Sequence, residues 1–380
     1  MLLACSRAAI QGGEHGQCAG TAVGETDWPE FVDQARWHGL APSAHRFLRS
    51  RSDLSLAMRT LLRHAAVAAL AENLRQIEGF KLVARTFTRS GIPWLCVKGP
   101  VAATTLYCDP GLRPFSDIDL LIRLQDFERA YASLEDAGFK PCFDLTPKWR
   151  ALYFRDRSQT AFRAASTIDL HWELLPNRYS FAPPTSAIWE RAERVSVFDV
   201  LVDTPSAYDS LVYLCLHAAR HDWERLIWLV DIAVLIRHSD RLNWDAFAKD
   251  LEHASLKVPL KVTLMLVAEL FEFDFPEIIS NRLRGDTIAA ILCRERIRRW
   301  QNGGTLSKAP WPWKSLYYRS MMISGDRRRY WHDVLLRPTP LEWKAVPLPF
   351  ACRGAYYAFR PLRLIWKHLS NSRGRHSTAR

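Results

Sequence analysis

The chain has 380 residues, of which 48% are hydrophobic, 24% charged and 12% aromatic, and this balance excludes a wholly disordered, collagen-like or low-complexity protein. It carries 52 lysine and arginine residues against 40 aspartate and glutamate residues, which gives a formal net charge of +12 with histidine neutral. The length suggests about two domains.

Glycine and other small residues dominate the start of the chain without a sustained periodicity, so we expect a disordered arm over residues 1–25. The start lacks the basic and apolar regions of a signal peptide. The most apolar long window, residues 211–236, is interrupted by charged residues and histidines, so we expect no membrane span. The eight cysteines stand singly without a metal-binding pair, which favours reduced thiols in a cytoplasmic protein.

Apolar residues then recur at helical spacing from Leu54 to Ser90 without a proline, which predicts a helix that ends at Gly91. We therefore expect a helical lead-in over residues 26–90.

The pattern next changes to short apolar runs separated by turns, which is typical of strands. The predicted strands lie at 92–97, 116–123 and 166–174, with a pair of strands within 153–163, and the predicted helices lie at 101–107 and 125–137. Gly138 follows the second helix where glycine is favoured. Residues 91–185 are thus predicted to form a small α/β unit with a mixed sheet.

The helical period returns from about Ala187 to Gln301, and a stretch rich in tryptophan and proline follows, so we expect a helical domain over 186–342. The last segment, residues 343–380, has basic residues and no acid. A solvated basic tail explains this segment, and so does a surface that contacts nucleic acid, a nucleotide phosphate or another anionic partner.

Two acids, Asp117 and Asp119, stand at the start of the predicted strand over 116–123. Side chains alternate along a strand, so both carboxylates project from one face, about 7 Å apart. Like charges on one face of a buried strand repel each other, and a shared divalent metal ion would relieve that repulsion. The same two-acid pattern also arises by chance in a chain of this length.

The sequence Lys98-Gly99-Pro100 follows another apolar run and precedes a predicted helix. Glycine allows a ligand to approach the backbone, the free N–H groups of a helix start favour phosphate, and Lys98 adds a positive charge. Taken alone, the pattern fits an ordinary turn with a solvated lysine better.

Polar residues alternate with apolar ones over residues 167–173, which places Asp169, His171 and Glu173 on one face of a strand. A half-exposed edge strand gives the same pattern. In combination, a phosphate-binding turn, a pair of carboxylates and a third carboxylate are the parts of a two-metal site for phosphoryl transfer.

These motifs, in this order, resemble the bacterial family described as uncharacterised nucleotidyltransferase, which belongs to the DNA polymerase β-like superfamily. The resemblance is carried by Lys98-Gly99, Leu106-Tyr107, Asp109-Pro110-Gly111, Arg113-Pro114, residues 116–121 and residues 168–172, and further along by residues 217–221, 228–232 and 360–364. It covers about residues 30–368. It implies an α+β fold: a minimal polymerase β-like nucleotidyltransferase domain with a mixed sheet, flanked by helices and followed by a mainly helical domain.

The resemblance also implies roles for individual residues. Asp117, Asp119 and Asp169 would be the catalytic acids that bind two Mg²⁺ ions. Lys98, Gly99, Arg113 and Ser116 would bind the nucleotide, and His171, His217 and His221 would line the substrate cleft. The turn departs from the Gly-Gly or Gly-Ser usual in the superfamily, because Lys98 precedes Gly99 here.

Two of these assignments have structural alternatives. Arg113 reaches a nucleotide phosphate or fixes its own loop by bonding carbonyl groups. His217 and His221 lie four residues apart, so they project from one side of a helix. A zinc site there is disfavoured because no third ligand stands at a suitable spacing, which leaves a structural role or a substrate contact.

The predicted function is therefore a Mg²⁺-dependent transfer of a nucleoside monophosphate from an NTP, with ATP as the leading donor, to an acceptor that the sequence does not specify. Similar proteins often accompany polysaccharide or peptide natural-product gene sets. The alternatives are a non-catalytic module that binds a nucleotide or a protein, nucleotidylation of a protein in a toxin–antitoxin pair, and nucleic-acid binding by the basic C-terminal segment. If the acids serve catalysis alone, Asp117→Asn and Asp119→Asn should abolish turnover and leave the fold intact.

Overall fold

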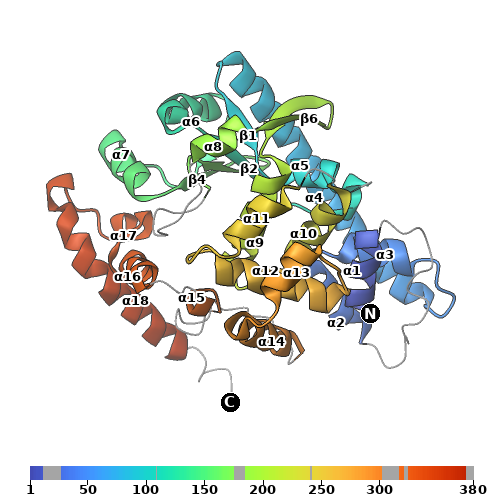
Figure 1. Cartoon of the computed structure of the whole chain (residues 1–380). Coiled ribbons are helices and arrows are strands. Elements are labelled where there is room, and N and C mark those ends of the chain that lie inside the picture. Colours follow the sequence, from blue (N-terminus) through green and yellow to red (C-terminus); the bar gives the residue numbers. More distant parts are fainter. Residues whose placement is uncertain are drawn as a thin grey trace.

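A computed structural model of the chain describes residues 1–11, 27–107, 109–174, 185–239, 242–301, 316–320 and 324–373. Its described part contains a seven-stranded sheet with the strand order β3-β4-β5-β2-β1-β7-β6. Figure 1 labels β1, β2, β4 and β6 of this sheet. The strands are β1 (Trp94–Cys96), β2 (Ile118–Ile122), β3 (Lys140–Pro141), β4 (Gln159–Arg163), β5 (Thr167–His171), β6 (Glu193–Val197) and β7 (Val200–Thr204). Because β2 runs parallel to β5 and antiparallel to β1, the sheet is mixed, and the predicted α+β class is confirmed.

Strand β2 is buried along its whole length, between helices on both faces of the sheet. On one face, Ile118 and Leu120 pack against α4 (Leu56–Arg89) and α6 (Phe127–Asp136). On the other face, Leu121 packs with residues of β1, α8 (Thr185–Glu190) and α9 (Ala207–Arg220). Since side chains alternate along a strand, Asp119 lies on this second face, beneath α9.

A second core is built from helices of the N-terminal part and of the region after the sheet. Its helices include α1 (Leu2–Gln11), α2 (Trp28–Trp37), α3 (Ala41–Leu48), α10 (Leu226–His238), α11 (Trp244–Asp250), α12 (Lys257–Phe271), α13 (Glu277–Leu283) and α14 (Thr287–Gln301). The remaining described helices are α5 (Pro100–Thr105), α7 (Pro147–Asp156), α15 (Leu316–Ser320), α16 (Ser324–Trp331), α17 (Pro340–Ala345) and α18 (Tyr356–Arg373), with short 3-10 turns η1 (Pro110–Leu112), η2 (Leu124–Asp126) and η5 (Phe350–Ala355) and a π-helical turn η4 (His332–Leu336). No helix in the described parts of the chain combines the length and apolarity that crossing a membrane requires.

The N-terminal arm differs from the expectation of disorder over residues 1–25. Residues 2–11 form α1, which buries Cys5, Ala8 and Ile10 against α3, α10 and α12. The helix is short and rich in small residues, so its stability comes from tertiary packing that a local sequence pattern does not reveal. Residues 12–26 lie outside the described part of the chain.

Two other elements correct the sequence-based prediction. Residues 153–163 were expected to hold two strands, but α7 extends to Asp156 and only β4 is a strand. Pro147 begins α7, where its fixed φ suits the first turn of a helix. The hairpin β6–β7 lies inside the region expected to be helical, so the sheet continues to Thr204, beyond the expected boundary at residue 185.

The basic C-terminal segment is folded over most of its length and lies beside α7 (Figure 1). Glu342 is fully buried and accepts hydrogen bonds from Arg360 and Arg363 of α18. Trp149 of α7 stacks with Trp343 at a centroid distance of 4.7 Å. At least two of the basic side chains are therefore engaged internally and do not form a solvated tail.

A buried ion pair joins the loop before β2 to the helical core. Asp231 of α10 is fully buried and lies 2.8 Å from Nη2 of Arg113, and its Oδ1 accepts a hydrogen bond of 2.7 Å from the Tyr107 hydroxyl. A carboxylate removed from water in this way is tolerated because its charge is paired and its oxygens are bonded. The contact fixes the position of the helical core relative to the sheet.

We predict that Asp231→Asn lowers the free energy of unfolding by about 3–5 kcal/mol, because it leaves the buried Arg113 guanidinium without its counter-charge. Asp203→Asn is the matched control, since Asp203 pairs with Arg194 at 2.7 Å on the surface and its loss should cost below about 1 kcal/mol. Urea denaturation of both variants measures the difference. Equal losses would contradict a special role for the buried pair.

Candidate active site

The candidate site is centred on two neighbouring strands of the sheet. In the parallel ladder between β2 and β5, Asp119 stands directly opposite Asp169. The strand pairing therefore brings two carboxylates together although they are 50 residues apart in the sequence. His171, two residues after Asp169, points to the same face, and one ligand atom from each of the three residues lies within 4.8 Å of the others.

Asp119 is the most engaged of these acids, with 2% of its surface exposed. Its Oδ1 accepts a hydrogen bond of 3.2 Å from Nε2 of His171, and its Oδ2 lies 3.1 Å from Nζ of Lys98. Burial raises the pKa of Asp119, but the positive charge of Lys98 and the bond from His171 outweigh burial and hold the pKa well below its usual range. Lys98 and His171 thus favour the ionised form of this buried carboxylate.

The other two acids behave in the opposite way. Burial, followed by the negative charge of Asp119, raises the pKa of Asp169 to about 6 and raises that of Asp117. Asp117 is half-buried and precedes β2, and it lies outside the group of three ligand atoms around Asp119. The charge of Asp119 thus destabilises the ionised forms of Asp117 and Asp169. A divalent cation bound among the three carboxylates would stabilise the site.

Polar side chains of α4 hold the backbone on both sides of these acids. Asn73 donates to the carbonyl of Arg113 at 3.1 Å and accepts from the N–H of Phe115 at 2.9 Å, so it fixes the loop that leads into β2. Gln76, three residues along the same helix, accepts from the N–H of Thr167 at the start of β5. The sequence analysis predicted this part of the chain only as a helical lead-in, because the burial of Asn73 and Gln76, which marks such a role, is seen only in the structure.

The Lys98-Gly99 turn packs directly against the start of β2. Gly99 has a φ of +67°, and a Cβ at this position would lie 2.7 Å from the carbonyl oxygen of Asp117. Glycine is therefore required both by the backbone conformation and by the close approach of two chain segments. The turn lies next to the acids, as the two-metal hypothesis needs, while its contact with a phosphate remains a prediction. Ser116 is exposed in the neighbouring loop.

Arg113 does not project freely toward the acids. Its guanidinium is 5% exposed and bound to Asp231, as described above, and Nη1 reaches the carbonyl of Pro114 at 3.4 Å. This environment favours the loop-fixing interpretation of Arg113 over a contact with a nucleotide phosphate.

His217 lies in the last turn of α9 and His221 directly follows the helix, with their ring centroids 4.8 Å apart. Trp228 of α10 packs against both rings at 5.2 Å. Tyr213, one turn earlier on α9, packs against Leu121 on the sheet face that carries Asp119. Sequence reasoning missed Tyr213, although its spacing of four residues from His217 places it on the same side of the helix.

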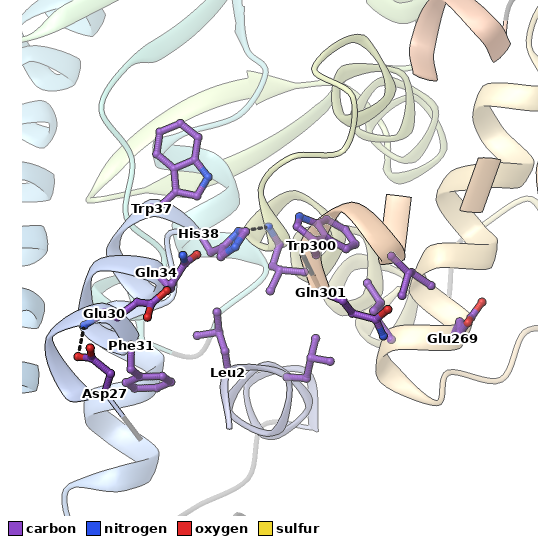
Figure 2. Close-up of a pocket in the computed structure, with 14 residues that line it drawn as sticks. Leu2, Asp27, Glu30, Phe31, Gln34, Trp37, His38, Glu269, Trp300 and Gln301 are labelled. Atoms are coloured by element: carbon purple, nitrogen blue, oxygen red, sulfur yellow. Dashed lines mark hydrogen bonds between the residues drawn. The ribbon is translucent and has the colours of Figure 1, made fainter. Parts of the chain in front are cut away.

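A separate pocket of about 710 Å³ lies among α1, α2, α12 and α14 (Figure 2). Trp37, Phe31 and Trp300 supply aromatic surface, and none of the acids of the β2–β5 site lines this pocket. His38, at its inner wall, accepts a hydrogen bond of 3.3 Å from the N–H of Leu226, which Figure 2 shows as a dashed line. The pocket belongs to the helical core, and His38 stabilises the start of α10.

This combination of a mixed sheet, paired acids on adjacent strands and an adjoining lysine-glycine turn defines a nucleotidyltransferase domain. The family model described as uncharacterised nucleotidyltransferase matches residues 24–272, which is more than half of the chain. The chain therefore belongs to this nucleotidyltransferase family, and it is a transferase enzyme.

No curated characterised protein matches the chain. Among solved structures, the crystal structure of the lincosamide antibiotic adenylyltransferase LnuA bound to lincomycin matches with 17% sequence identity and a TM-score of 0.29, over 40% of this chain and 91% of the other. That likeness is too distant to inform the substrate of this protein.

We predict that Gly99→Ala destabilises the protein more than Gly138→Ala does. Both glycines have positive φ, so both variants carry the backbone strain of about 1 kcal/mol, but a Cβ at Gly138 meets nothing within 4 Å. Only Gly99→Ala adds a clash with Asp117. Thermal unfolding of the two variants separates the backbone strain from the clash with Asp117. An equal loss of stability in both variants would show that the close approach at Gly99 is unimportant.

We predict that the free energy of unfolding depends on pH through the titration of His38. Burial, with smaller effects of Arg296 and Arg225, lowers the pKa of His38 from 6.5 to about 4. Since the unfolded chain then binds the proton more readily, the contribution of His38 is complete above about pH 6.5 and is lost as the pH falls toward 4, by up to about 3 kcal/mol.

The measurement is denaturant unfolding at pH 7.5, 6 and 4.5 for the wild-type protein and His38→Gln. The stability difference between the two proteins should shrink toward acid pH, because the variant lacks this titration. A difference that stays constant with pH would contradict the assignment.

Proposed function

We propose that this protein is a Mg²⁺-dependent nucleotidyltransferase that moves a nucleoside monophosphate from an NTP, with ATP as the expected donor, to an acceptor. The observation that carries the proposal is the cluster of the buried Asp119 and His171 with the half-buried Asp169, beside Lys98 and Asp117, in a chain of a nucleotidyltransferase family. The acceptor is an open part of the proposal, with precursors of polysaccharides and of peptide natural products as the first to screen.

The donor set fits a divalent cation. Carboxylate oxygens are the ligands that Mg²⁺ prefers. Burial, followed by the negative charge of Asp119, raises the pKa values of Asp117 and Asp169, so a bound cation would stabilise their ionised forms. Asp117, Asp119 and Asp169 would share two Mg²⁺ ions. When bound, Mg²⁺ neutralises phosphate charge and favours ionisation of the acceptor hydroxyl.

His171 suits a positioning role better than a ligand role, because Mg²⁺ binds oxygen in preference to imidazole nitrogen. Its Nε2–H donates to Oδ1 of Asp119, which fixes the orientation of that carboxylate. Lys98 holds Oδ2 of the same carboxylate and brings a positive charge to the edge of the site. Both residues keep Asp119 ionised and in one orientation.

In the proposed reaction the acceptor oxygen attacks the α-phosphorus of the NTP, and a new P–O bond forms. The bond between the α-phosphorus and the oxygen that bridges to the β-phosphate breaks, and pyrophosphate leaves with that electron pair. The proton of the acceptor passes to a carboxylate of the cluster. Asp169 is the candidate, because in the described part of the structure it has no ion-pair partner of its own, whereas Asp119 has Lys98.

The test is a calorimetric and thermal-shift titration of the full chain with each of the four NTPs, with and without Mg²⁺. A ligand that binds the folded state raises the melting temperature by mass action, so the proposal predicts a Mg²⁺-dependent rise for at least one NTP. A folded protein that binds no NTP would overturn the proposal and favour the protein-binding module, for which a pull-down is the next step.

We predict that Asp169→Asn and Asp119→Asn both lower nucleotidyl transfer at least about a hundredfold, because each removes a metal-binding carboxylate. Their effects on stability should differ. Asp169→Asn relieves repulsion from Asp119 and should leave the free energy of unfolding unchanged or higher, whereas Asp119→Asn strands the buried Lys98 and should cost about 3 kcal/mol.

The ion pair with Lys98 thus changes the sequence-based expectation that Asp119→Asn leaves the fold intact. Urea denaturation and a pyrophosphate-release assay on both variants measure the two effects. If Asp169→Asn destabilised the protein as much as Asp119→Asn, Asp169 would have a structural role that the proposal does not assign.

A further inference from the structure

Helix α9 presents one side to the sheet face that carries the acids. Tyr213, His217 and Arg220 recur at spacings of four and three residues, so they share this side of the helix. Tyr213 packs with Leu121 of β2, and Asp119 is the strongest charge acting on its hydroxyl. The side of α9 that bears these three residues, called the α9 wall below, therefore stands opposite the acids.

The α9 wall holds polar atoms without partners. The Tyr213 hydroxyl and Nδ1 of His217 are buried, on side chains that are 4% and 6% exposed, and neither has a hydrogen-bond partner among the described residues. Leaving a buried polar group unpaired is costly, and in native proteins such groups usually meet a ligand or water. The unpaired atoms thus point to a ligand with hydrogen-bonding oxygens.

The wall also holds the positive charge of Arg220. This side chain is half-buried, and no carboxylate of the described residues lies within ion-pair distance of it. Burial and the positive charges of Lys98 and Arg220 hold the pKa of His217 well below its usual range. The α9 side therefore carries the positive charge of Arg220, while the acids lie on the strand side.

We infer that the α9 wall binds the β- and γ-phosphates of the nucleotide, with Arg220 as the ion-pairing cation and Tyr213 and His217 as hydrogen-bond donors. This inference rests on the proposed function, which places the α-phosphate at the acids where the bond is exchanged. The terminal phosphates carry most of the charge and must extend away from the carboxylates, toward the α9 donors and Arg220, which have no partners among the residues that the structure describes. Arg220, Tyr213 and His217 would then hold the pyrophosphate as it leaves.

The experiment is isothermal titration calorimetry of the full chain with Mg²⁺ and four probes: ATP, AMP, inorganic pyrophosphate and inorganic phosphate. Arg220→Gln should weaken the binding of ATP and pyrophosphate about ten- to a hundredfold, since a charge-assisted contact is lost. Its affinity for AMP should stay within about twofold of the wild-type value. Arg237→Gln is the matched control, because Arg237 stands in the last turn of α10 as Arg220 does in α9. That variant should bind all four probes as the wild-type protein does.

Tyr213→Phe provides a second, conservative variant that keeps the ring and removes only the unpaired hydroxyl. This variant should bind ATP several-fold more weakly. Without ligand it should melt at the same temperature as the wild-type protein or at a higher one, because a buried unpaired hydroxyl is removed. Lower stability of Tyr213→Phe with unchanged ATP affinity would assign the hydroxyl to the fold and overturn the inference.

Other outcomes separate this inference from the proposed function. If the wild-type protein binds ATP and Arg220→Gln binds it equally well, the α9 wall does not hold the triphosphate, while the proposed function stands. An equal loss of AMP binding would also overturn the inference, since the wall would then act on the nucleoside or on the fold. If Arg220→Gln lost only the binding of inorganic phosphate and bound ATP as before, the inference would be overturned, and the α9 wall would bind a phosphate group of another ligand. If the wild-type protein binds neither ATP nor pyrophosphate, the proposed function and this inference fail together.

Discussion

The Asp119 carboxylate is the charge on which the arrangement of the site depends. It is removed from water at the centre of the sheet, where a lone carboxylate would be too costly to bury, and it is retained because Lys98 and His171 each bind one of its oxygens. These two partners come from the turn after β1 and from β5, so the pairing ties three segments of the chain together. It also keeps Asp119 ionised beside two acids whose pKa values it raises. The fold thus positions a cluster of carboxylates around the ionised Asp119.

The surrounding structure serves to hold this cluster in place. Asn73 and Gln76 of α4 bond the backbone where it enters β2 and β5, and Gly99 lets the lysine-bearing turn lie against the start of β2. The buried pair of Arg113 and Asp231 fixes the same loop to the helical core. Helix α9 extends from that core over the sheet, which explains why the second core has to be placed accurately for the site to be complete.

Much of this site could be predicted where its signals are local. The alternation of residue types marked β2 and β5, and the acids Asp117, Asp119 and Asp169 stood out because charges are unexpected on buried strands. Their closeness in space depends on the pairing of β2 with β5, which a single sequence does not encode locally. The partners of Asp119 and the donors of α9 depend on the same long-range packing, so the resemblance to a family pointed to His217 while Tyr213 went unnoticed.

The errors in the sequence-based prediction of the fold have the same cause. α1 was predicted as disordered because its small residues become informative only when they are buried against α3, α10 and α12. The aromatic run around Tyr153 has the composition of a strand, yet it forms α7, whose Tyr153 and Phe154 pack against Trp172. Local propensity was overridden by tertiary contacts in both segments.

The proposed chemistry requires that this carboxylate cluster bind a divalent cation. The decisive experiment is titration of the full chain with Mn²⁺, followed by electron paramagnetic resonance in the presence of a non-hydrolysable ATP analogue, since Mn²⁺ takes the same oxygen ligands as Mg²⁺. We expect bound Mn²⁺ with the wild-type protein and a strong reduction in Asp169→Asn, which should remain folded. Failure of the folded wild-type protein to bind Mn²⁺, or binding that Asp169→Asn leaves unchanged, would contradict the proposed chemistry.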